Sequence, residues 1–294
     1  MRMQKKQSTV STEKSKSSIY SAKKNTQTST KKSKKKVRAE LLPKKRVKGE
    51  CILTLCAHND DQIIGAGGTI RRYVDEGISA YTYIFSYGEA SHPHLRPEVI
   101  AKRRERESLQ SARILGDTIA YLELKEGTFT ETCDRTELKN IIRMHNPTKI
   151  FTHAPDDPHP DHIAVYKIVT SVAKEMNFKG EIYAFDIWNL FSVKTNHYPK
   201  LFVDISKTFW VKVKALLKHK SQVNAIVSLG WHMYLKALIN GWNNHCRYAE
   251  LFHKINLDTI EVSNSSASVS SSLDKQSVND SKKKKRTKQQ LKNK

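Results

Sequence analysis

Short apolar runs alternate with longer amphipathic stretches between residues 51 and 187. The runs are rich in β-branched and aromatic residues and predict strands at residues 51–57, 80–86, 119–124, 148–154 and 181–187. The longer stretches carry apolar residues at helical spacing and predict helices at residues 62–77, 97–116, 134–146 and 161–177. Two of these helices end at Gly77 and Gly116, and a third stops before Pro147. The repeated strand and helix pattern indicates an α/β fold, a Rossmann-like three-layer sandwich with a mostly parallel sheet.

The segment from Val223 to Trp242, VNAIVSLGWHMYLKALINGW, is apolar but interrupted by Asn224, His232 and Lys236. It predicts a pair of buried or amphipathic helices; contact with an anionic membrane, together with the basic tails, is the alternative. The tryptophans are expected to pack in the core or at its edges, or else to stack on a sugar ring; they are Trp188, Trp210, Trp231 and Trp242. No run approaches the roughly 20 apolar residues of a transmembrane helix, and no apolar signal segment follows the basic N-terminus. We expect a soluble protein, cytoplasmic or, in a eukaryote, nuclear.

Charge is distributed unevenly along the 294 residues, whose formal net charge is +23. Residues 1–49 hold 17 Lys and Arg against 2 acidic residues, and residues 258–294 hold 9 against 4. Residues 50–257 carry 26 basic and 23 acidic side chains, a net +3. The flanks have too few apolar residues to offset the entropy of ordering, which predicts one folded domain between two disordered basic tails. The lysine blocks are expected to bind polyanions without specificity, with nuclear import or nucleic-acid contact as alternatives.

Two polar motifs stand directly after predicted strands. AHNDDQ, residues 57–62, follows the first strand, and HPDH, residues 159–162, follows the fourth. In open parallel sheets, sites form beyond the carboxyl ends of strands where the strand order reverses, so we expect the two loops to meet. Each motif alone is more simply explained as a helix N-cap. Their joint occurrence favours a metal site, because the residues that they bring together are ligand types that Zn²⁺ takes: His58, Asp60, Asp61, His159, Asp161 and His162.

Spacing assigns a role to most of these residues. His58 and Asp61 are three apart on a loop that enters a helix, so both can bind one ion. A third ligand, His162, would leave an open position for water, as in catalytic zinc sites. Asp60 is then free to act as general base, and His159 to stabilise the oxyanion of a tetrahedral intermediate. We expect one Zn²⁺ per chain, although iron or manganese would also accept this set of ligands.

The motifs resemble those of the LmbE-like zinc deacetylases, which include the N-acetylglucosaminyl-phosphatidylinositol de-N-acetylases and deacetylases of low-molecular-weight thiol synthesis. The family pattern is Ala-His-Pro-Asp-Asp-Glu, a Gly-Gly turn, and later His-Pro-Asp-His; this chain reads AHNDDQIIGAGGTI and HPDHIAV. Further matches are SYGEA, Arg104 with Glu107, HKSQ and AELF. The resemblance covers roughly residues 50–257. It implies the same assignment as the spacing, with His58, Asp61 and His162 as zinc ligands, Asp60 as general base and His159 as transition-state stabiliser.

The resemblance also implies an activity, the hydrolysis of an N-acetyl group of a GlcNAc-containing glycoconjugate. Arg104 and Glu89 become candidate substrate-binding residues, although the charged segment around Arg104 is more simply a solvated helix face. Asn59 and Gln62 stand where the family has proline and glutamate, so we expect an active enzyme with altered metal affinity. Two alternatives stay open. The same centre would serve an amidase acting on a non-sugar amide, and a decayed core would leave a polyanion-binding protein.

Overall fold

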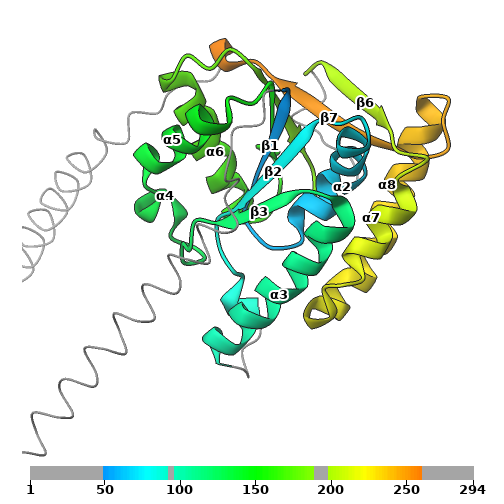
Figure 1. Ribbon diagram of the computed structural model, residues 1–294, viewed down its shortest axis with the longest axis horizontal. Coiled ribbons are helices and arrows are strands. Elements are labelled where there is room, and N and C mark those ends of the chain that lie inside the picture. Colours follow the sequence, from blue (N-terminus) through cyan, green and yellow to red (C-terminus); the bar gives the residue numbers. More distant parts are fainter. Residues whose placement is uncertain (1–48, 92–95, 189–197, 260–294) are drawn as a thin grey trace, which may run out of the picture. The chain divides into compact units, whose positions relative to one another are not determined.

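The computed structural model describes residues 49–91, 96–188 and 198–259, which form a mixed seven-stranded sheet (Figure 1). The strands lie in the order β3-β2-β1-β4-β5-β7-β6. Their bounds are β1 Cys51–Cys56, β2 Ser79–Ile84, β3 Thr118–Tyr121, β4 Lys149–His153, β5 Glu181–Phe185, β6 Lys200–Asp204 and β7 Ala249–Ile255. Strands β1 to β5 pair in parallel, whereas β7 runs antiparallel to both β5 and β6. The predicted α/β class with a mostly parallel sheet is confirmed.

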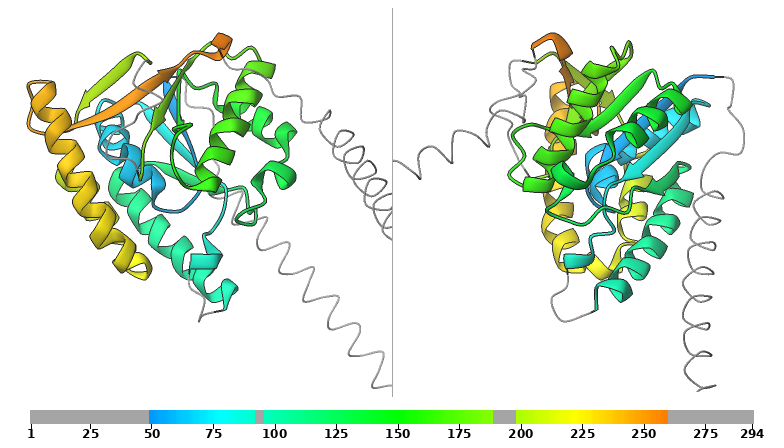
Figure 2. Two further views of the ribbon diagram at one scale, coloured as in Figure 1. Left: turned by 180° about the vertical axis from the view of Figure 1, so that it is seen from behind. Right: turned by 90° about the vertical axis from the view of Figure 1, so that its left-hand side faces the viewer.

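Helices cover both faces of the sheet and complete the three layers (Figure 2). On one face α6 contacts β1 and β4, with α4 and α5 beside it, and the other face carries α2, α3, α7 and α8. Their bounds are α2 Asp61–Asp75, α3 Pro97–Leu115, α4 Phe129–Thr132, α5 Arg135–His145, α6 Pro160–Glu175, α7 Phe209–Leu216 and α8 Val223–Asn243. Short 3₁₀ turns are η1 Glu89–Ser91, η3 Lys220–Gln222 and η4 Leu257–Thr259. Because both faces are covered, all six residues of β1 are buried.

The five strands and four helices predicted between residues 51 and 187 all exist, with helix bounds within two residues of those expected. Strands β6 and β7 were not predicted, and the predicted pair of C-terminal helices is wrong, because Val223–Asn243 is one continuous helix. The tryptophans do not lie in the core, since their exposed fractions are 44% for Trp188, 59% for Trp210, 65% for Trp231 and 85% for Trp242. Packing at the edge, the other part of that expectation, is found for Trp210 against Phe209 and for Trp231 against Tyr234. The basic tails, predicted to be disordered, lie almost entirely outside the described residues.

The glycine-rich patch of α2 permits close packing of this helix. A Cβ on Gly65 would lie 2.3 Å from Cδ2 of Phe185, and one on Gly68 would lie 2.7 Å from Cδ1 of Ile205. Real Cβ atoms do not come this close to another heavy atom, so a larger residue would push α2 away from β5 and from the chain that follows β6. These glycines therefore hold the first turns of α2 against the sheet.

A buried ion pair fixes the same part of α2. Lys212 of α7 is 1% exposed, and its Nζ lies 2.5 Å from Oε1 of Glu250 on β7. Nζ also donates to the Ile64 carbonyl, while the Glu250 carboxylate accepts from the backbone amides of Gly68 and Thr69. Each charge is thus paired and hydrogen-bonded, which a buried ion pair requires. Part of α2 is thus held by residues 148 and 182 positions further along the chain.

A carboxyl group at the start of β3 makes stability depend on pH. Burial raises the pKa of Asp117 to about 7, although Thr82 Oγ1 donates a hydrogen bond to Oδ2 at 2.9 Å. A raised pKa means that the folded state holds its proton longer than the unfolded state, so stability is lost as pH rises from about 4 through 7. Three pKa units correspond to about 4 kcal/mol at most.

Asp117→Asn is therefore expected to stabilise the protein at high pH. The asparagine keeps an acceptor for Thr82 and cannot ionise, so its advantage over the natural protein should grow by about 2 kcal/mol between pH 5 and pH 8. Thermal unfolding followed by circular dichroism at the two pH values measures this change. Asp134→Asn is the matched control, because Asp134 is an exposed N-cap at which asparagine serves equally well. An advantage that does not grow with pH would contradict the raised pKa.

Candidate metal centre and active site

The two predicted motifs meet at the carboxyl ends of β1 and β4. These strands are parallel neighbours in the sheet, and the strand order reverses between them. His58 follows β1 on the loop into α2, and His162 lies in the first turn of α6, which follows β4. The site thus occupies the switch point where open α/β sheets bind ligands, as expected.

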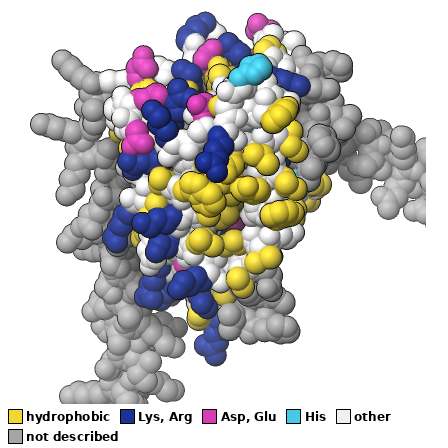
Figure 3. Space-filling model, turned by 90° about the vertical axis from the view of Figure 1, so that its right-hand side faces the viewer, with side chains coloured by type: hydrophobic (Ala, Val, Ile, Leu, Met, Phe, Trp, Pro, Cys, Tyr) yellow, Lys and Arg dark blue, Asp and Glu magenta, His cyan; other side chains and the backbone are white. Residues whose placement is uncertain are grey.

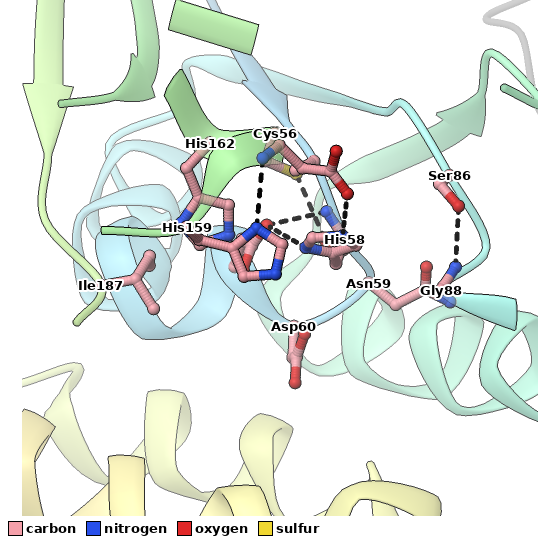
Figure 4. A network of polar contacts seen from close by, with 12 residues as sticks. Cys56, His58, Asn59, Asp60, Ser86, Gly88, His159, His162 and Ile187 are labelled. Carbon is pink, nitrogen blue, oxygen red and sulfur yellow. Dashed lines mark hydrogen bonds and ion pairs between the residues drawn. The ribbon is translucent and has the colours of Figure 1, made fainter. Parts of the chain in front are cut away.

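Three side chains form the centre of the site (Figure 4). Nδ1 of His58 lies 3.5 Å from Oδ2 of Asp61, and Nε2 of His162 lies 3.4 Å from Oδ1 of the same carboxylate. One ligand atom from each of the three residues lies within 4.8 Å of the other two. Asp61 is oriented by its own loop, because the His58 backbone amide donates to its Oδ2 at 2.7 Å. The arrangement is suited to holding one divalent cation.

In both histidines, the ring nitrogen that faces away from Asp61, here called the outer nitrogen, lies beside a carboxylate. Nε2 of His58 lies 3.3 Å from both Oδ2 of Asp161 and Oε1 of Glu126, and Nδ1 of His162 lies 2.9 Å from Oδ1 of Asp157. Histidines that bind metals commonly donate their other ring N–H to a carboxylate, which sets the ring orientation and the tautomer. The remaining nitrogens, Nδ1 of His58 and Nε2 of His162, then face Asp61.

These contacts shift the pKa values of the three residues. Burial by itself would lower the pKa of His58, but hydrogen bonds to Asp161 and Asp61 raise it to about 10. Burial likewise opposes ionisation of His162, yet the Asp61 charge and the bond to Asp157 raise its pKa to about 9. The pKa of Asp61 lies well below its usual range despite burial, because His162 is adjacent. The cluster therefore strongly favours positive charge beside Asp61.

His159 lies at the edge of this cluster as the N-cap of α6. Its Nδ1 accepts a hydrogen bond from the Asp161 backbone amide at 3.2 Å. Burial and the nearby His162 lower its pKa, so the ring is neutral and carries its proton on Nε2. Its ring centroid lies 5.0 Å from that of His58 and 4.6 Å from that of His162. His159 can therefore donate one hydrogen bond beside the candidate ligands.

Asp60 is held by an arginine from α3. Arg104 is 3% exposed, and its Nη2 lies 3.3 Å from Oδ1 of Asp60. Its Nη1 donates to the Gly88 carbonyl at 2.9 Å. Gly88 has φ +69°, and a Cβ there would lie 1.8 Å from Nη1 of Arg104, so glycine is required. Arg104 is thus buried at the site, and the simpler interpretation of a solvated helix face is wrong.

Three further residues from the motifs that resemble the LmbE-like family lie around the site without joining the metal cluster. Glu89 is half-buried and accepts from Ser86 Oγ at 2.8 Å, and it does not line the cavity described below. The Glu107 carboxylate accepts from the backbone amide of Ser221 at 2.9 Å, which ties the HKSQ turn to α3. His219 is fully buried, with Nε2 2.9 Å from Ser111 Oγ. Glu107 and His219 thus connect elements around the site.

A cavity of about 380 Å³ opens over the cluster. Its lining includes the candidate ligands with Asp60, His159 and Arg104, and the apolar side chains of Ile64, Ala90, Ile187, Trp188 and Leu229. Two other groups of potential ligands exist among the described residues, namely His58 with His159 and Asp161, and His153 with Asp157 and His162. Neither group suits a catalytic ion as well as His58, Asp61 and His162 do. In the first, backbone amides occupy His159 Nδ1 and Asp161 Oδ1, and the second is fully buried.

Comparison with known proteins identifies the family. The PIG-L family, described as GlcNAc-PI de-N-acetylase, matches residues 53–173. Diacetylchitobiose deacetylase of Thermococcus kodakarensis is 30% identical over 215 residues, which are 68% of this chain and 80% of that protein. The chain belongs to the PIG-L family.

Two further proteins extend the comparison. A probable N-acetyl-alpha-D-glucosaminyl L-malate deacetylase 2 of Bacillus cereus is 28% identical over 192 residues, covering 60% of this chain and 85% of that protein. The structure of N,N'-diacetylchitobiose deacetylase from Pyrococcus horikoshii has a TM-score of 0.61 and 23% identity, and the match covers 80% of this chain and 96% of that one. At this identity the structural match shows the shared fold.

Two residues depart from the PIG-L pattern, and both are buried. Asn59 is fully buried, and its backbone carbonyl accepts from Ser108 Oγ at 3.4 Å. Gln62 is 1% exposed, and its Oε1 lies 3.7 Å from the Cys56 thiol. The Cys56 sulfur has a pKa well above its ordinary value, because it is buried near Asp61. The neutral amide therefore lies beside a neutral thiol.

Three residues of this PIG-L site had no assigned role in the sequence analysis. Asp157 could have been found, because it lies in the same loop as HPDH, two residues before His159. Glu126 follows β3 in a stretch without a recognisable motif. His153 ends β4, accepts from the Ala57 amide and lies 3.2 Å from Asp61. No pattern in the sequence distinguishes Glu126 or His153 from ordinary surface or core residues.

Proposed function

We propose that this protein is a metal-dependent N-deacetylase that hydrolyses the N-acetyl group of a GlcNAc-containing glycoconjugate. The observation that carries the proposal is the convergence of His58, Asp61 and His162 within 4.8 Å of one another, on a cavity that Asp60 and His159 also line. The catalytic domain is proposed to span residues 50–257, the part that holds every one of these groups.

The donor set supports a zinc ion held by His58, Asp61 and His162. Two imidazoles and one carboxylate are the protein ligands of many catalytic zinc sites, although iron or manganese would also accept them. The outer nitrogens of both imidazoles are already engaged by Asp161 and Asp157, which leaves the inner ones for the ion. A bound divalent ion would polarise the amide carbonyl and make water a better nucleophile at neutral pH.

Asp60 is proposed to move the protons of the reaction. Its carboxylate takes one proton from the attacking water and then delivers it to the departing nitrogen, so that amide and water become amine and acetate. Arg104 holds one oxygen of this carboxylate and thereby orients the other. His159 donates from Nε2 to the oxygen that gains negative charge in the tetrahedral intermediate.

The substrate class is proposed from the relatives and from the cavity. Two similar proteins bear names of deacetylases for diacetylchitobiose and for a glucosaminyl malate. The cavity of about 380 Å³ is lined by both polar and apolar side chains, which suits a sugar with hydroxyls on its edges and an apolar face. Arg104 and Glu89 remain candidates for substrate contact, and of the two only Arg104 lines the cavity.

The test is acetate release by the full-length protein from N,N'-diacetylchitobiose and other N-acetylglucosamine conjugates. Metal-stripped protein should release no acetate, and one equivalent of zinc should restore release. Bound zinc without release from any of these sugars would overturn the sugar substrate and favour an amidase for a non-sugar amide. No zinc and no release would indicate a decayed centre, and the polyanion-binding alternative would then be tested on the basic tails.

A further inference from the structure

Large exposed hydrophobic side chains are concentrated on α7, α8 and the turn between them. This region holds eight of the eleven that occur among the described residues: Trp210, Leu217, Val223, Val227, Trp231, Leu238, Ile239 and Trp242. Figure 3 shows a continuous apolar patch on this side of the molecule, with Lys and Arg along much of its margin and some Asp and Glu towards the top. We call this patch the α7–α8 face. Soluble monomers rarely expose apolar patches of this kind unless the patch binds something.

Helix α8 carries apolar residues both on the side that packs against the domain and on the side that faces solvent. Its inner side consists of Ile226, Leu229, Met233 and Ala237, which are all buried. Its outer side carries Val223, Val227, Trp231, Leu238 and Trp242, spaced so that they form one stripe at 3.6 residues per turn. A surface helix normally presents polar residues outward, whereas a helix that is apolar all round is buried on both sides. We therefore expect the outer stripe to be covered by a second apolar surface.

The stripe continues onto α7. Trp210 and Leu217 are exposed at positions seven apart, which lie on the same side of a helix. The aromatic ring of Phe209 lies 5.9 Å from that of Tyr234 on α8, and Tyr234 in turn stacks with Trp231 at 5.8 Å. These ring contacts pack α7 against α8, and the apolar patch on this side of the molecule is continuous in Figure 3.

Charge distinguishes among possible partners of this surface. Residues 205–249 contain seven Lys and Arg and no Asp or Glu. Lys207, Lys214 and Lys220 are exposed at the margin. Two copies of the chain facing each other through this segment would bring its lysines together, and the segment itself has no acidic group to pair with them. An apolar surface with negative charge at its edge is complementary instead.

We propose that the α7–α8 face docks on an anionic lipid bilayer. Tryptophans and aliphatic side chains enter the boundary between headgroups and acyl chains, while the marginal lysines reach the lipid phosphates. The basic segments at residues 1–49 and 258–294 add attraction to the same negative surface. Docking is in the plane of the membrane, since no helix in the described ranges is long and apolar enough to cross one. The proposal does not depend on the reaction at the metal centre.

The test is binding of the full-length protein to vesicles. We expect co-sedimentation with vesicles of phosphatidylcholine and phosphatidylglycerol, and much weaker binding to phosphatidylcholine alone. The variant Trp231→Ser/Trp242→Ser should bind at least about tenfold more weakly, because two large apolar side chains no longer leave water. Lipids brominated in their acyl chains should quench the tryptophan fluorescence of the natural protein and quench that of the variant less.

Met144→Ser is the matched control, since Met144 is an exposed apolar residue of α5, on the opposite side of the sheet. It should bind vesicles as the natural protein does. Equal binding by the tryptophan variant, or no quenching by brominated lipid, would mean that the basic tails alone bind the vesicles and would overturn the proposal. It would also be overturned by a dimer in sedimentation equilibrium that the tryptophan variant dissociates, because the face would then join two copies.

Discussion

Asp60→Asn is expected to lower the rate of acetate release by about 10²- to 10⁴-fold, the range that a lost general base costs. Asparagine fills the same space next to Arg104, but it cannot take a proton from water. Asp60 forms no side-chain hydrogen bond that caps α2, so the helix should keep its start. Metal content should therefore stay close to that of the natural protein, whereas the unfolding temperature should fall, because the buried Arg104 loses the carboxylate with which it pairs.

The measurement is the steady-state rate of acetate release with zinc present, together with the zinc content of the same samples. Glu89→Gln is the control, because Glu89 is a carboxylate of the same region that does not line the cavity. Its rate should change by less than the rate of the Asp60 variant. If Asp60→Asn kept full activity, another group would have to be the base.

The neighbouring substitution, Asp61→Asn, is expected to remove the metal and, with it, all activity. Asp61 lies between His58 and His162, and its charge balances the positive charge that this cluster attracts. Changes to residues behind the ligands typically cost about 10- to 100-fold in metal affinity. Loss of a ligand should cost more than that, and excess zinc should not restore the rate.

Zinc content by elemental analysis after dialysis separates the two carboxylates. The Asp60 variant should retain one zinc per chain and be slow, whereas the Asp61 variant should retain none. The opposite result would exchange their roles. Equal loss of metal in both would mean that the loop itself had rearranged, which unfolding curves of the two variants would reveal.

The part of the site that lies in the two loops was predictable because local sequence determines it. His58 and Asp61 are three residues apart, and His162 begins a helix directly after a strand, so their meeting follows from the parallel pairing of β1 and β4. The same reasoning predicted the α/β fold from alternating strands and helices. What these features share is that each can be recognised within a few consecutive residues.

Features that depend on distant contacts were not predictable. Glu126 lies in the loop between β3 and α4, and only the fold brings this loop next to His58. The residues around Glu126 in the sequence form no motif. The α8 sequence predicted helical packing, but apolar spacing cannot say which part of a largely apolar helix is left exposed. Arg104 was expected on a solvated face because charged residues surround it, yet it turns inward to Asp60.

The position of β7 has a consequence for how the chain folds during its synthesis. β7, the last strand among the described residues, lies between β5 and β6, and its Glu250 completes the pairing that holds α2. A nascent chain that ends before Ala249 has therefore made β1 to β5 but leaves the edge of β5 unpaired. Unpaired edges of this kind invite pairing with other chains. We therefore expect the nascent chain to be prone to aggregation through the β5 edge until all of β7, up to Ile255, has left the ribosome.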